Sequence, residues 1–471
     1  MTRSFPSVDD DTQLFDTPIL DALGTRFVGR NELVYNVRDF GAKGDGTADD
    51  TDAIQAAIDA AIGGPPEGAA ATTRRSRADV FVPGGTYNLS RPLKLYGVRG
   101  LRIYGSGFGT ALVATVNMAA FFDLNGFSYG AAEYFYLRGA AATIEVTQPV
   151  KIDWDPAVSA PSTSSVTCRK IRVSDVKFVH AFAVGVNSSN LDVSQISLYD
   201  CFAAGKWVSG ETTWYQGAFT AGSGVSGNVL NHWFYGCTAN GTRYAFFCNN
   251  ATMSVFGSSV GFCEVDFYQV GARPMVVDGF RSENSQRLFA QAGGGSYAAE
   301  ASISNGIFTT GLLAADSFWI RQAYGGTVAL KNVTAQPSTG KTPVIQITAT
   351  FKALMTLTGV ASTATLAGRF AFGTGATGTV VDINAYTINA SGQVDATRAF
   401  WTKHLGALTP SQLPTFADGI VVGGPLQQAS YTTATRPAAA SYPGASIFDT
   451  TLGKPVWSNG AAWVDSTGTA V

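Results

Sequence analysis

The sequence predicts an all-β protein built as a solenoid, in which short strands stack coil upon coil. A short motif recurs along residues 78–385: an apolar residue, then any residue, then Gly, Asn or Asp. The composition agrees, because 53 glycines and a charged fraction of only 14% suit strands and turns better than helical bundles. An amphipathic helix pattern at residues 50–61 precedes strand-like sequence for most of the chain.

The recurring motif places a corner residue at eight positions. These are Asp175, Asp200, Gly236, Gly257, Gly279, Asn305, Asn332 and Gly359, at separations of 25, 36, 21, 22, 26, 27 and 27 residues. A repeat of this length is typical of stacked coils, and Gly and Asn tolerate the left-handed backbone that a corner often needs. The apolar residue two positions before each corner is expected to point inward. Each coil then buries its core only against its neighbours.

The stretch 34–61 combines a strand, a loop and a helix. Residues 34–40 alternate apolar and polar side chains, which is the period of a half-buried strand. Asp49, Asp50 and Thr51 offer oxygens that cap a helix start. The helix then carries one apolar stripe, formed by Ala53, Ile54, Ala57, Ile58 and Ala61. We expect this helix to cover the exposed end of the sheet.

This stretch, together with Val80–Leu89 and Leu101–Gly107, resembles the N-terminal signature of the pectate-lyase-like superfamily. The resemblance implies a right-handed parallel β-helix whose first coil is capped by the helix. The superfamily hosts lyases, hydrolases and binding proteins, so the fold alone does not name the chemistry.

The C-terminal part of the sequence predicts a small module of three short strands, at 447–449, 455–457 and 463–465. Asn459–Gly460 is a hairpin signal between the last two, and a module of this size is expected to need neighbours for stability. It resembles a C-terminal motif that is widespread in phage tail fibre and spike proteins. The residues that carry this match are Phe448–Pro455, Trp457, Asn459–Gly460 and Trp463–Asp465. The resemblance implies a homotrimer of β-helices with an N-terminal part bound to the virion.

The chain therefore divides into four predicted parts. Residues 1–33 form an N-terminal arm that attaches to phage tail or baseplate proteins or, alternatively, packs on the first coil. Residues 34–400 form the β-helix body, residues 401–435 an irregular linker, and residues 436–471 the C-terminal module.

Composition excludes several other classes of protein. The net charge of −2 gives no basic footprint for nucleic acid, and no apolar run reaches the roughly 18 residues of a membrane span. The N-terminus lacks the apolar core of a signal peptide, so we expect synthesis in the host cytoplasm and a final location in the virion. The five cysteines show no C-x-x-C spacing and read as buried free thiols. The three histidines are scattered, and neither a metal nor a cofactor is expected.

Acidic residues concentrate in one stretch of the predicted body. They are Glu264, Asp266, Asp278 and Glu283. Glycoside hydrolysis uses two carboxyl groups across one sugar, and equivalent positions on stacked coils lie roughly 5 Å apart. We therefore predict catalytic carboxylates here, with Glu283 foremost and Arg281 binding substrate. The alternative is a structural role at coil corners. A lyase would instead need a base, for which Arg281, His232 or Lys206 could serve.

Aromatic residues mark two candidate loops. Trp154 lies in the stretch 140–161, and Trp207, Trp214 and Tyr215 lie in the long insertion at 203–229. Long loops in a compact body are often functional, and exposed aromatic rings have apolar faces on which sugars stack. We predict glycan binding by these four rings. The alternative is packing against the solenoid or across a subunit interface.

Together these features predict a phage tail spike that binds and depolymerises a bacterial surface polysaccharide of capsule or O-antigen type, with glycoside hydrolysis favoured over a lyase reaction. A non-enzymatic adhesin or structural tail protein on the same fold is the main alternative. A free bacterial pectin-type enzyme is a third reading, against which the C-terminal motif and the lack of a signal peptide argue.

Overall fold

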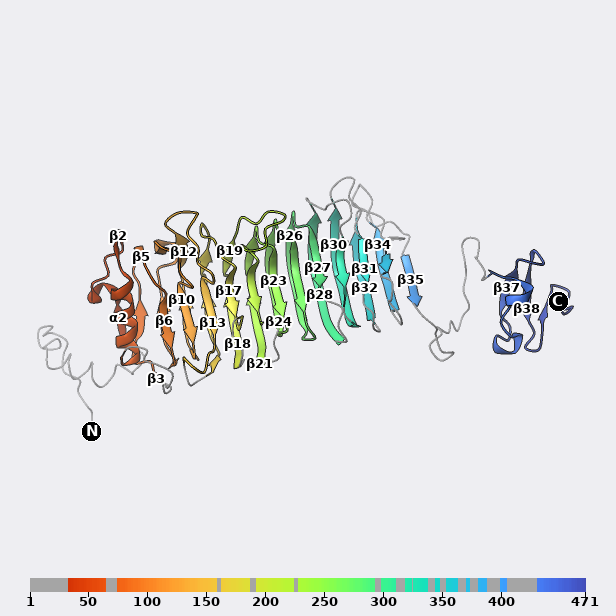
Figure 1. Ribbon diagram of the computed structural model, residues 1–471, viewed down its shortest axis with the longest axis horizontal. Coiled ribbons are helices and arrows are strands. Elements are labelled where there is room, and N and C mark those ends of the chain that lie inside the picture. The colour runs from red at the N-terminus through yellow and green to blue at the C-terminus, as the bar shows by residue number, and fades with distance from the viewer. Residues whose placement is uncertain are drawn as a thin grey trace, which may run out of the picture. The chain divides into compact units, whose positions relative to one another are not determined.

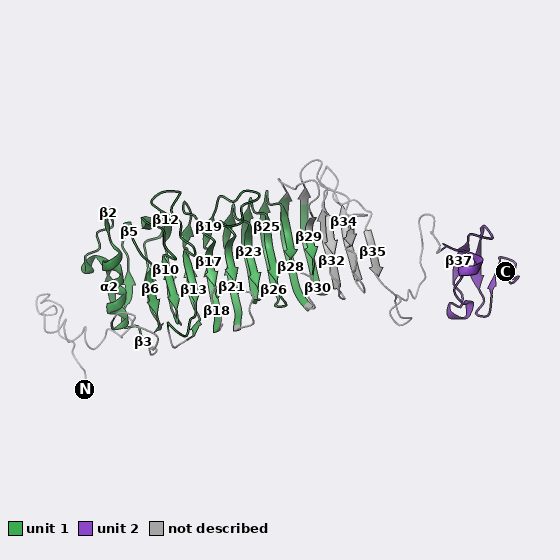
Figure 2. Ribbon diagram, in the orientation of Figure 1, with its two compact units in different colours: residues 1–407 green, residues 408–471 purple. Residues whose placement is uncertain are grey.

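The structure is a computed structural model, and Figure 2 divides it into two compact units, residues 1–407 and 408–471. It describes residues 33–64, 74–158, 162–186, 192–223, 228–292, 298–310, 318–323, 325–337, 344–347, 353–362, 370–372, 380–387, 399–404 and 430–471. The predicted arm, apart from residue 33, and residues 405–429 of the predicted linker lie outside these ranges. The four-part division therefore stays a prediction.

Two long sheets make up the described part of the first unit, and Figure 1 shows their strands stacked along one axis. Sheet A has 22 strands and sheet B has 11 among the described residues. The strands of sheet A are β1 (Val34–Asn36), β2 (Asp45–Asp49), β4 (Asp79–Phe81), β5 (Gly85–Leu89), β8 (Arg102–Tyr104), β9 (Thr110–Ala114), β11 (Ala131–Glu133), β12 (Tyr136–Gly139), β14 (Thr163–Ser164), β15 (Thr167–Arg169), β16 (Arg172–Val173), β18 (Asp192–Tyr199), β19 (Phe202–Ala204), β21 (Asn228–Tyr235), β22 (Thr238–Asn240), β24 (Met253–Gly261), β26 (Met275–Glu283), β28 (Ala298–Thr310), β30 (Gly325–Pro337), β32 (Ala353–Ser362), β34 (Val380–Thr387) and β35 (Ala399–His404). The strands of sheet B are β6 (Leu93–Tyr96), β10 (Phe122–Asn125), β13 (Val150–Asp153), β17 (His180–Val184), β20 (Gly217–Ala221), β23 (Tyr244–Asn249), β25 (Val265–Val270), β27 (Arg287–Gln291), β29 (Phe318–Gln322), β31 (Val344–Ile347) and β33 (Phe370–Phe372). A separate pair is formed by β3 (Arg74–Arg75) and β7 (Val98–Arg99), and short 3-10 helices are η1 (Val37–Phe40) and η2 (Gly107–Gly109).

Neighbouring coils pair in parallel along both sheets. In sheet A, β18 pairs with β21, β21 with β24 and β24 with β26, all parallel. In sheet B, β17, β20, β23 and β25 follow one another in the same way. At the far end of sheet A the direction reverses, because β35 pairs with β34 antiparallel. The predicted all-β class and its parallel β-helix architecture are confirmed.

The core consists of inward-pointing rows that repeat from coil to coil. In sheet B the rings of Phe182, Phe219, Phe246 and Phe267 are fully buried. Their centroids are 5.0, 5.0 and 5.7 Å apart along the stack. Each such ring removes enough apolar surface from water to stabilise the fold by roughly 1.5–3 kcal/mol. The five cysteines, all buried and free, contribute to the same interior, as predicted.

Seven of the eight predicted corner residues have the expected left-handed backbone, although one of them belongs to another corner. The eighth, Gly359, stays a prediction. Asp200, Gly236, Gly257, Gly279, Asn305 and Asn332 form one row, with φ between 51° and 67°. Asp175 also has positive φ, at 57°, but it belongs to a different corner. Arg169 pairs with Tyr199, so Lys170 (φ 50°) precedes Asp200 in that row. Val173 pairs with Ala203, which places Asp175 beside Gly205 instead.

Helix α2 (Thr51–Ile62) lies at the N-terminal end of the stack (Figure 1). Its buried face includes Ile54, Ala57, Ile58 and Ala61, as the stripe predicts. The Thr51 amide donates to Asp49 Oδ1 at 3.0 Å. Asp50 holds the preceding loop, accepting from the amides of Lys43 and Gly44. No helix among the described residues has the length and apolarity to cross a membrane.

The described part of the second unit is a four-stranded sheet with its own core. Its strands are β36 (Ser430–Tyr431), β37 (Ser446–Asp449), β38 (Lys454–Ser458) and β39 (Trp463–Val464), and its 3-10 helices are η4 (Thr433–Thr435) and η5 (Ala439–Ser441). The three strands predicted in the module match β37, β38 and β39. Two polar contacts also hold this unit together. The buried side chains of Arg436 and Asp449 form an ion pair at 2.8 Å. The Trp463 indole also donates to the Pro437 carbonyl at 2.7 Å.

Candidate functional site

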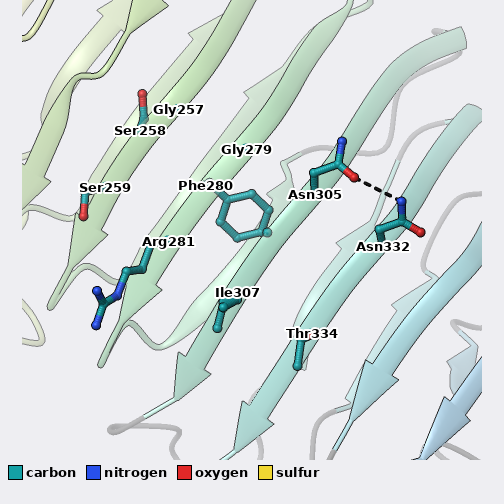
Figure 3. Close-up of a pocket in the computed structure, with 11 residues that line it drawn as sticks. Gly257, Ser258, Ser259, Gly279, Phe280, Arg281, Asn305, Ile307, Asn332 and Thr334 are labelled. Atoms are coloured by element: carbon teal, nitrogen blue, oxygen red, sulfur yellow. Dashed lines mark hydrogen bonds between the residues drawn. The ribbon is translucent and has the colours of Figure 1, made fainter.

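An open groove of about 470 Å³ runs across four successive coils of sheet A (Figure 3). It is formed where β24, β26, β28 and β30 bend at the corner row. The lining residues are Gly257, Ser258, Ser259, Gly279, Phe280, Arg281, Asn305, Gly306, Ile307, Asn332 and Thr334. Because the groove crosses strands, its length follows the axis of the solenoid.

Corner residues form one side of the groove. Gly257 and Gly279 bring no side chain, which leaves that end open. Further along the row, Asn332 Nδ2 donates to Asn305 Oδ1 at 3.1 Å. Asn305 Nδ2 in turn donates to Asp278 Oδ1 at 2.7 Å. These bonds fix the amide groups in place and present polar atoms one coil apart.

The other side is a row of outward residues beyond the corner. Ser259, Arg281, Ile307 and Thr334 occupy equivalent positions on consecutive strands. Arg281 is exposed and pairs with Glu283 on the same strand. The wall between the two rows needs a glycine, because a Cβ at Gly306 would overlap the Phe280 ring.

The structure separates the four predicted acids. Glu283 is exposed and pairs with Arg281, which lines the groove. Asp278 lies on the same strand but accepts from Ser304 Oγ at 2.8 Å and from Asn305. These bonds, from Ser304 first and then from Asn305, lower the pKa of its carboxyl. Asp278 precedes the Gly279 corner and Glu283 follows it, so the two acids lie on different arms of the bent strand and are not arranged as a facing pair across one sugar, which glycoside hydrolysis uses.

Asp266 points into the solenoid and does not reach the groove. Its exposed fraction is 0%. Burial raises the pKa of this carboxyl to about 7, and the nearby hydroxyl groups of Ser282 and Ser285 lower the pKa to a smaller extent. A side chain without solvent access cannot contact a polymer on the surface, so Asp266 leaves the proposed catalytic set.

Glu264 belongs to an ion-pair network beside sheet B. Arg243 Nε lies 2.9 Å from one carboxylate oxygen and Arg287 Nη1 lies 2.6 Å from the other. Arg243 also donates to Gln216 Oε1 at 3.1 Å, which ties the network to the loop before β20. Because both carboxylate oxygens of Glu264 are paired with arginines, a structural role explains this residue.

The four predicted aromatic side chains are half-buried, and none of them lines the groove. Trp154 packs against the core. Tyr215 does the same, with its ring 5.1 Å from Phe178, and burial raises the pKa of its hydroxyl. The Trp207 indole donates to the Glu211 carbonyl at 3.1 Å, and the Lys177 ammonium lies 5.6 Å from the Trp214 ring. Packing against the solenoid, the alternative reading, describes these rings best.

The groove residues that the sequence did not identify are mostly uncharged and polar: Ser259, Asn305, Asn332 and Thr334. Asn305 and Asn332 were predicted only as corner residues. Ser259 and Thr334 could have been found from the register of the coils, because each lies two positions after a corner residue.

Comparison with known proteins gives the same fold. The family model for rhamnogalacturonase A/epimerase, pectate lyase-like, matches residues 34–254. Alginate lyase 7 of Azotobacter vinelandii is 52% identical over 58 residues, which cover 12% of this chain and 6% of the lyase. A glucan 1,3-beta-glucosidase of Cochliobolus carbonum is 42% identical over 66 residues, 14% of this chain and 8% of that enzyme. The matched stretches are thus a small part of either relative.

Solved structures extend the likeness beyond that stretch. The gp42 tailspike of Acinetobacter phage vb_AbaP_AS12 covers 90% of this chain, and the alignment covers 74% of the tailspike, with a TM-score of 0.50 and 13% identity. Tailspike protein 3 of bacteriophage CBA120 covers 96% of this chain and is itself covered to 71%, with a TM-score of 0.49 and 12% identity. This chain shares a parallel β-helix fold with the gp42 tailspike. At such identities the likeness concerns the fold.

Proposed function

We propose that this protein is a phage tail spike that binds a bacterial surface polysaccharide of capsule or O-antigen type. The observation that carries the proposal is the groove across β24, β26, β28 and β30, open to solvent along the solenoid axis. The fold likeness to tailspikes and the C-terminal motif support the same conclusion.

The groove suits a repeating polymer. Equivalent positions on successive coils recur about every 4.8 Å, a step comparable with the length of one pyranose residue. The amides of Asn305 and Asn332 and the hydroxyls of Ser259 and Thr334 supply donors and acceptors at that step. Arg281 adds a cation for acidic substituents, and Ile307 adds an apolar contact. Such a surface binds a chain lying along the axis.

Glu283 is the residue we propose for depolymerisation. Of the four predicted acids, it is the exposed one that pairs with a groove residue, Arg281, and this ion pair positions its carboxylate. The other three acids do not face it across one sugar, for the reasons given above. That separation favours the second candidate function, an adhesin that binds the glycan without cleaving it.

Two further parts of the proposal concern assembly. We propose a homotrimer, supported by the resemblance of the C-terminal module to a motif of trimeric spikes. We also propose that the N-terminal arm attaches the protein to other tail proteins of the virion.

Binding is tested on an array of purified bacterial capsular and O-antigen polysaccharides. We expect selective binding of one polymer, and binding to none of them on a broad array would refute the proposed function. Cleavage is then followed by the release of oligosaccharides from the bound polymer. New ultraviolet absorbance in the products identifies a lyase.

The catalytic role is tested with Glu283→Gln, with Glu145→Gln as the matched control. Glu145 is also ion-paired at the surface, 3.6 Å from Lys177, and lies outside the groove. We expect cleavage to be lost only in Glu283→Gln, with polymer binding retained. Full cleavage by Glu283→Gln removes Glu283 from the mechanism, and an intact polymer with the wild type establishes the adhesin.

A further inference from the structure

A second cluster of side chains on sheet A combines exposed aromatic surface with ordered polar groups. Its centre is Arg172, whose guanidinium carbon lies 4.0 Å from the Phe202 ring centroid and 5.6 Å from that of Phe108. Phe108 also meets Tyr136 edge to face, with centroids 6.2 Å apart. The Phe108 ring, in η2, is 71% exposed.

The polar groups of the cluster hold one another in fixed positions. The Tyr136 hydroxyl donates to Asp175 Oδ2 at 2.7 Å, and Ser174 Oγ donates to the same oxygen at 2.9 Å. Arg172 Nε donates to Ser174 Oγ at 3.3 Å. The two hydrogen bonds to Asp175, from Tyr136 first and then from Ser174, lower the pKa of its carboxyl. The exposed carboxylate is therefore ionised at neutral pH and accepts further hydrogen bonds.

The cluster is in line with the groove. Arg172 pairs with Phe202, Phe202 with Thr238, Thr238 with Ser259 and Ser259 with Arg281. Arg172 and Arg281 therefore occupy the same outward row, four coil steps apart. At about 4.8 Å per step the two sites are about 19 Å apart along the axis.

We infer that Phe108, Arg172 and Asp175 form a second glycan-binding subsite, which takes a pyranose unit of the same polymer that lies in the groove. The inference rests on the proposed glycan binding and adds where and how a longer chain is held. The apolar face of the sugar lies on the Phe108 ring, and its hydroxyls donate to the Asp175 carboxylate.

The exposure of Phe108 is what favours a ligand over a purely structural cluster. Phe202 and Tyr136 already cover Arg172 and are half-buried, whereas Phe108 leaves most of its ring in water. A large exposed ring beside ordered polar groups is the composition expected of a binding site. Two subsites on one polymer also raise affinity through effective concentration, without new contacts in either.

The test compares Phe108→Ala with Tyr129→Ala. Tyr129 is a matched control, because it is 65% exposed and lies near an arginine, Arg99, at 5.9 Å, but it belongs to neither site. Both rings are exposed, so neither substitution removes a core contact. The probe is the polysaccharide bound on the array, together with its oligosaccharides too short to span about 19 Å.

Calorimetry gives affinity and stoichiometry for each probe. We expect wild type and Tyr129→Ala to bind two short oligosaccharides per chain and Phe108→Ala to bind one. We also expect Phe108→Ala to lose about tenfold in affinity for the polymer. One short oligosaccharide per wild-type chain, or unchanged polymer affinity in Phe108→Ala, overturns the inference while leaving the groove as the binding site. Wild-type protein that binds no polysaccharide refutes the proposed function itself.

Discussion

Replacing Asp266 by Asn should stabilise the protein at neutral and alkaline pH. The carboxyl is fully buried, and burial raises its pKa from 3.8 to about 7. Between about pH 4 and about pH 7, the Asp266 carboxyl is protonated in the folded protein and ionised in the unfolded chain. Stability therefore falls as the pH rises from about 4 to about 7, and it stays at the lower level above that.

The magnitude follows from the width of that window. A difference of about three pH units, at 1.36 kcal/mol per unit, amounts to about 4 kcal/mol. Asn has nearly the same shape and carries no titratable proton, so the stability of Asp266→Asn should not fall over the same range. The two proteins should unfold at similar temperatures near pH 4. The variant should unfold at a higher temperature at pH 8.

Thermal unfolding of both proteins, measured at intervals from pH 4 to pH 8, checks this expectation. Asp278→Asn is the control with the opposite sign. Hydrogen bonds from Ser304 and Asn305 lower the pKa of Asp278, so its carboxylate stabilises the fold above the ordinary pKa, and this substitution should destabilise neutral protein. A difference between wild type and Asp266→Asn that does not change with pH would refute the buried-carboxyl argument.

Three other expectations concern packing and assembly. Gly306→Ala should destabilise the protein by about 1–3 kcal/mol through overlap with Phe280, whereas Gly109→Ala, which has open space around the new methyl group, should be nearly neutral in the same melts. Asp449→Asn leaves Arg436 without its counter-charge and should destabilise the C-terminal module, which is measured as faster proteolysis; equal protease resistance would count against a stabilising role of this ion pair. Light scattering should report a trimer that loosens when residues 436–471 are removed, and a wild-type monomer would contradict the proposed assembly.

The coil architecture was predictable because its signal is local. At each corner, an inward-pointing apolar residue is followed two positions later by a residue with left-handed backbone. Gly257, Gly279, Asn305 and Asn332 each complete this pattern within a few residues of sequence. Asp175 shows the limit of this signal. It satisfies the same local pattern at another corner of the coil, and only pairing between coils, which sequence spacing does not fix, tells the two corners apart.

The candidate site was predicted less well, because neighbours in sequence diverge in space. Glu264 and Glu283 lie on coils that are adjacent, yet a corner separates them onto different faces. Asp266 lies next to the first residue of a strand, and its side chain points into the core. Composition alone does not predict an acidic side chain there. The Phe108 cluster draws on residues from several coils, and no short motif brings Phe108, Arg172 and Asp175 together.

The reversal at β35 has a consequence for solubility. A stack of parallel strands ends in unpaired backbone groups, which can recruit another chain and begin aggregation. Among the described residues, β35 is the last strand of sheet A, and it pairs antiparallel with β34. It therefore runs opposite to the direction of the other strands in the stack. In the part of the chain that the structure describes, a further coil would therefore meet a strand that runs opposite to the parallel stack, and the unpaired backbone groups at this end of sheet A belong to β35.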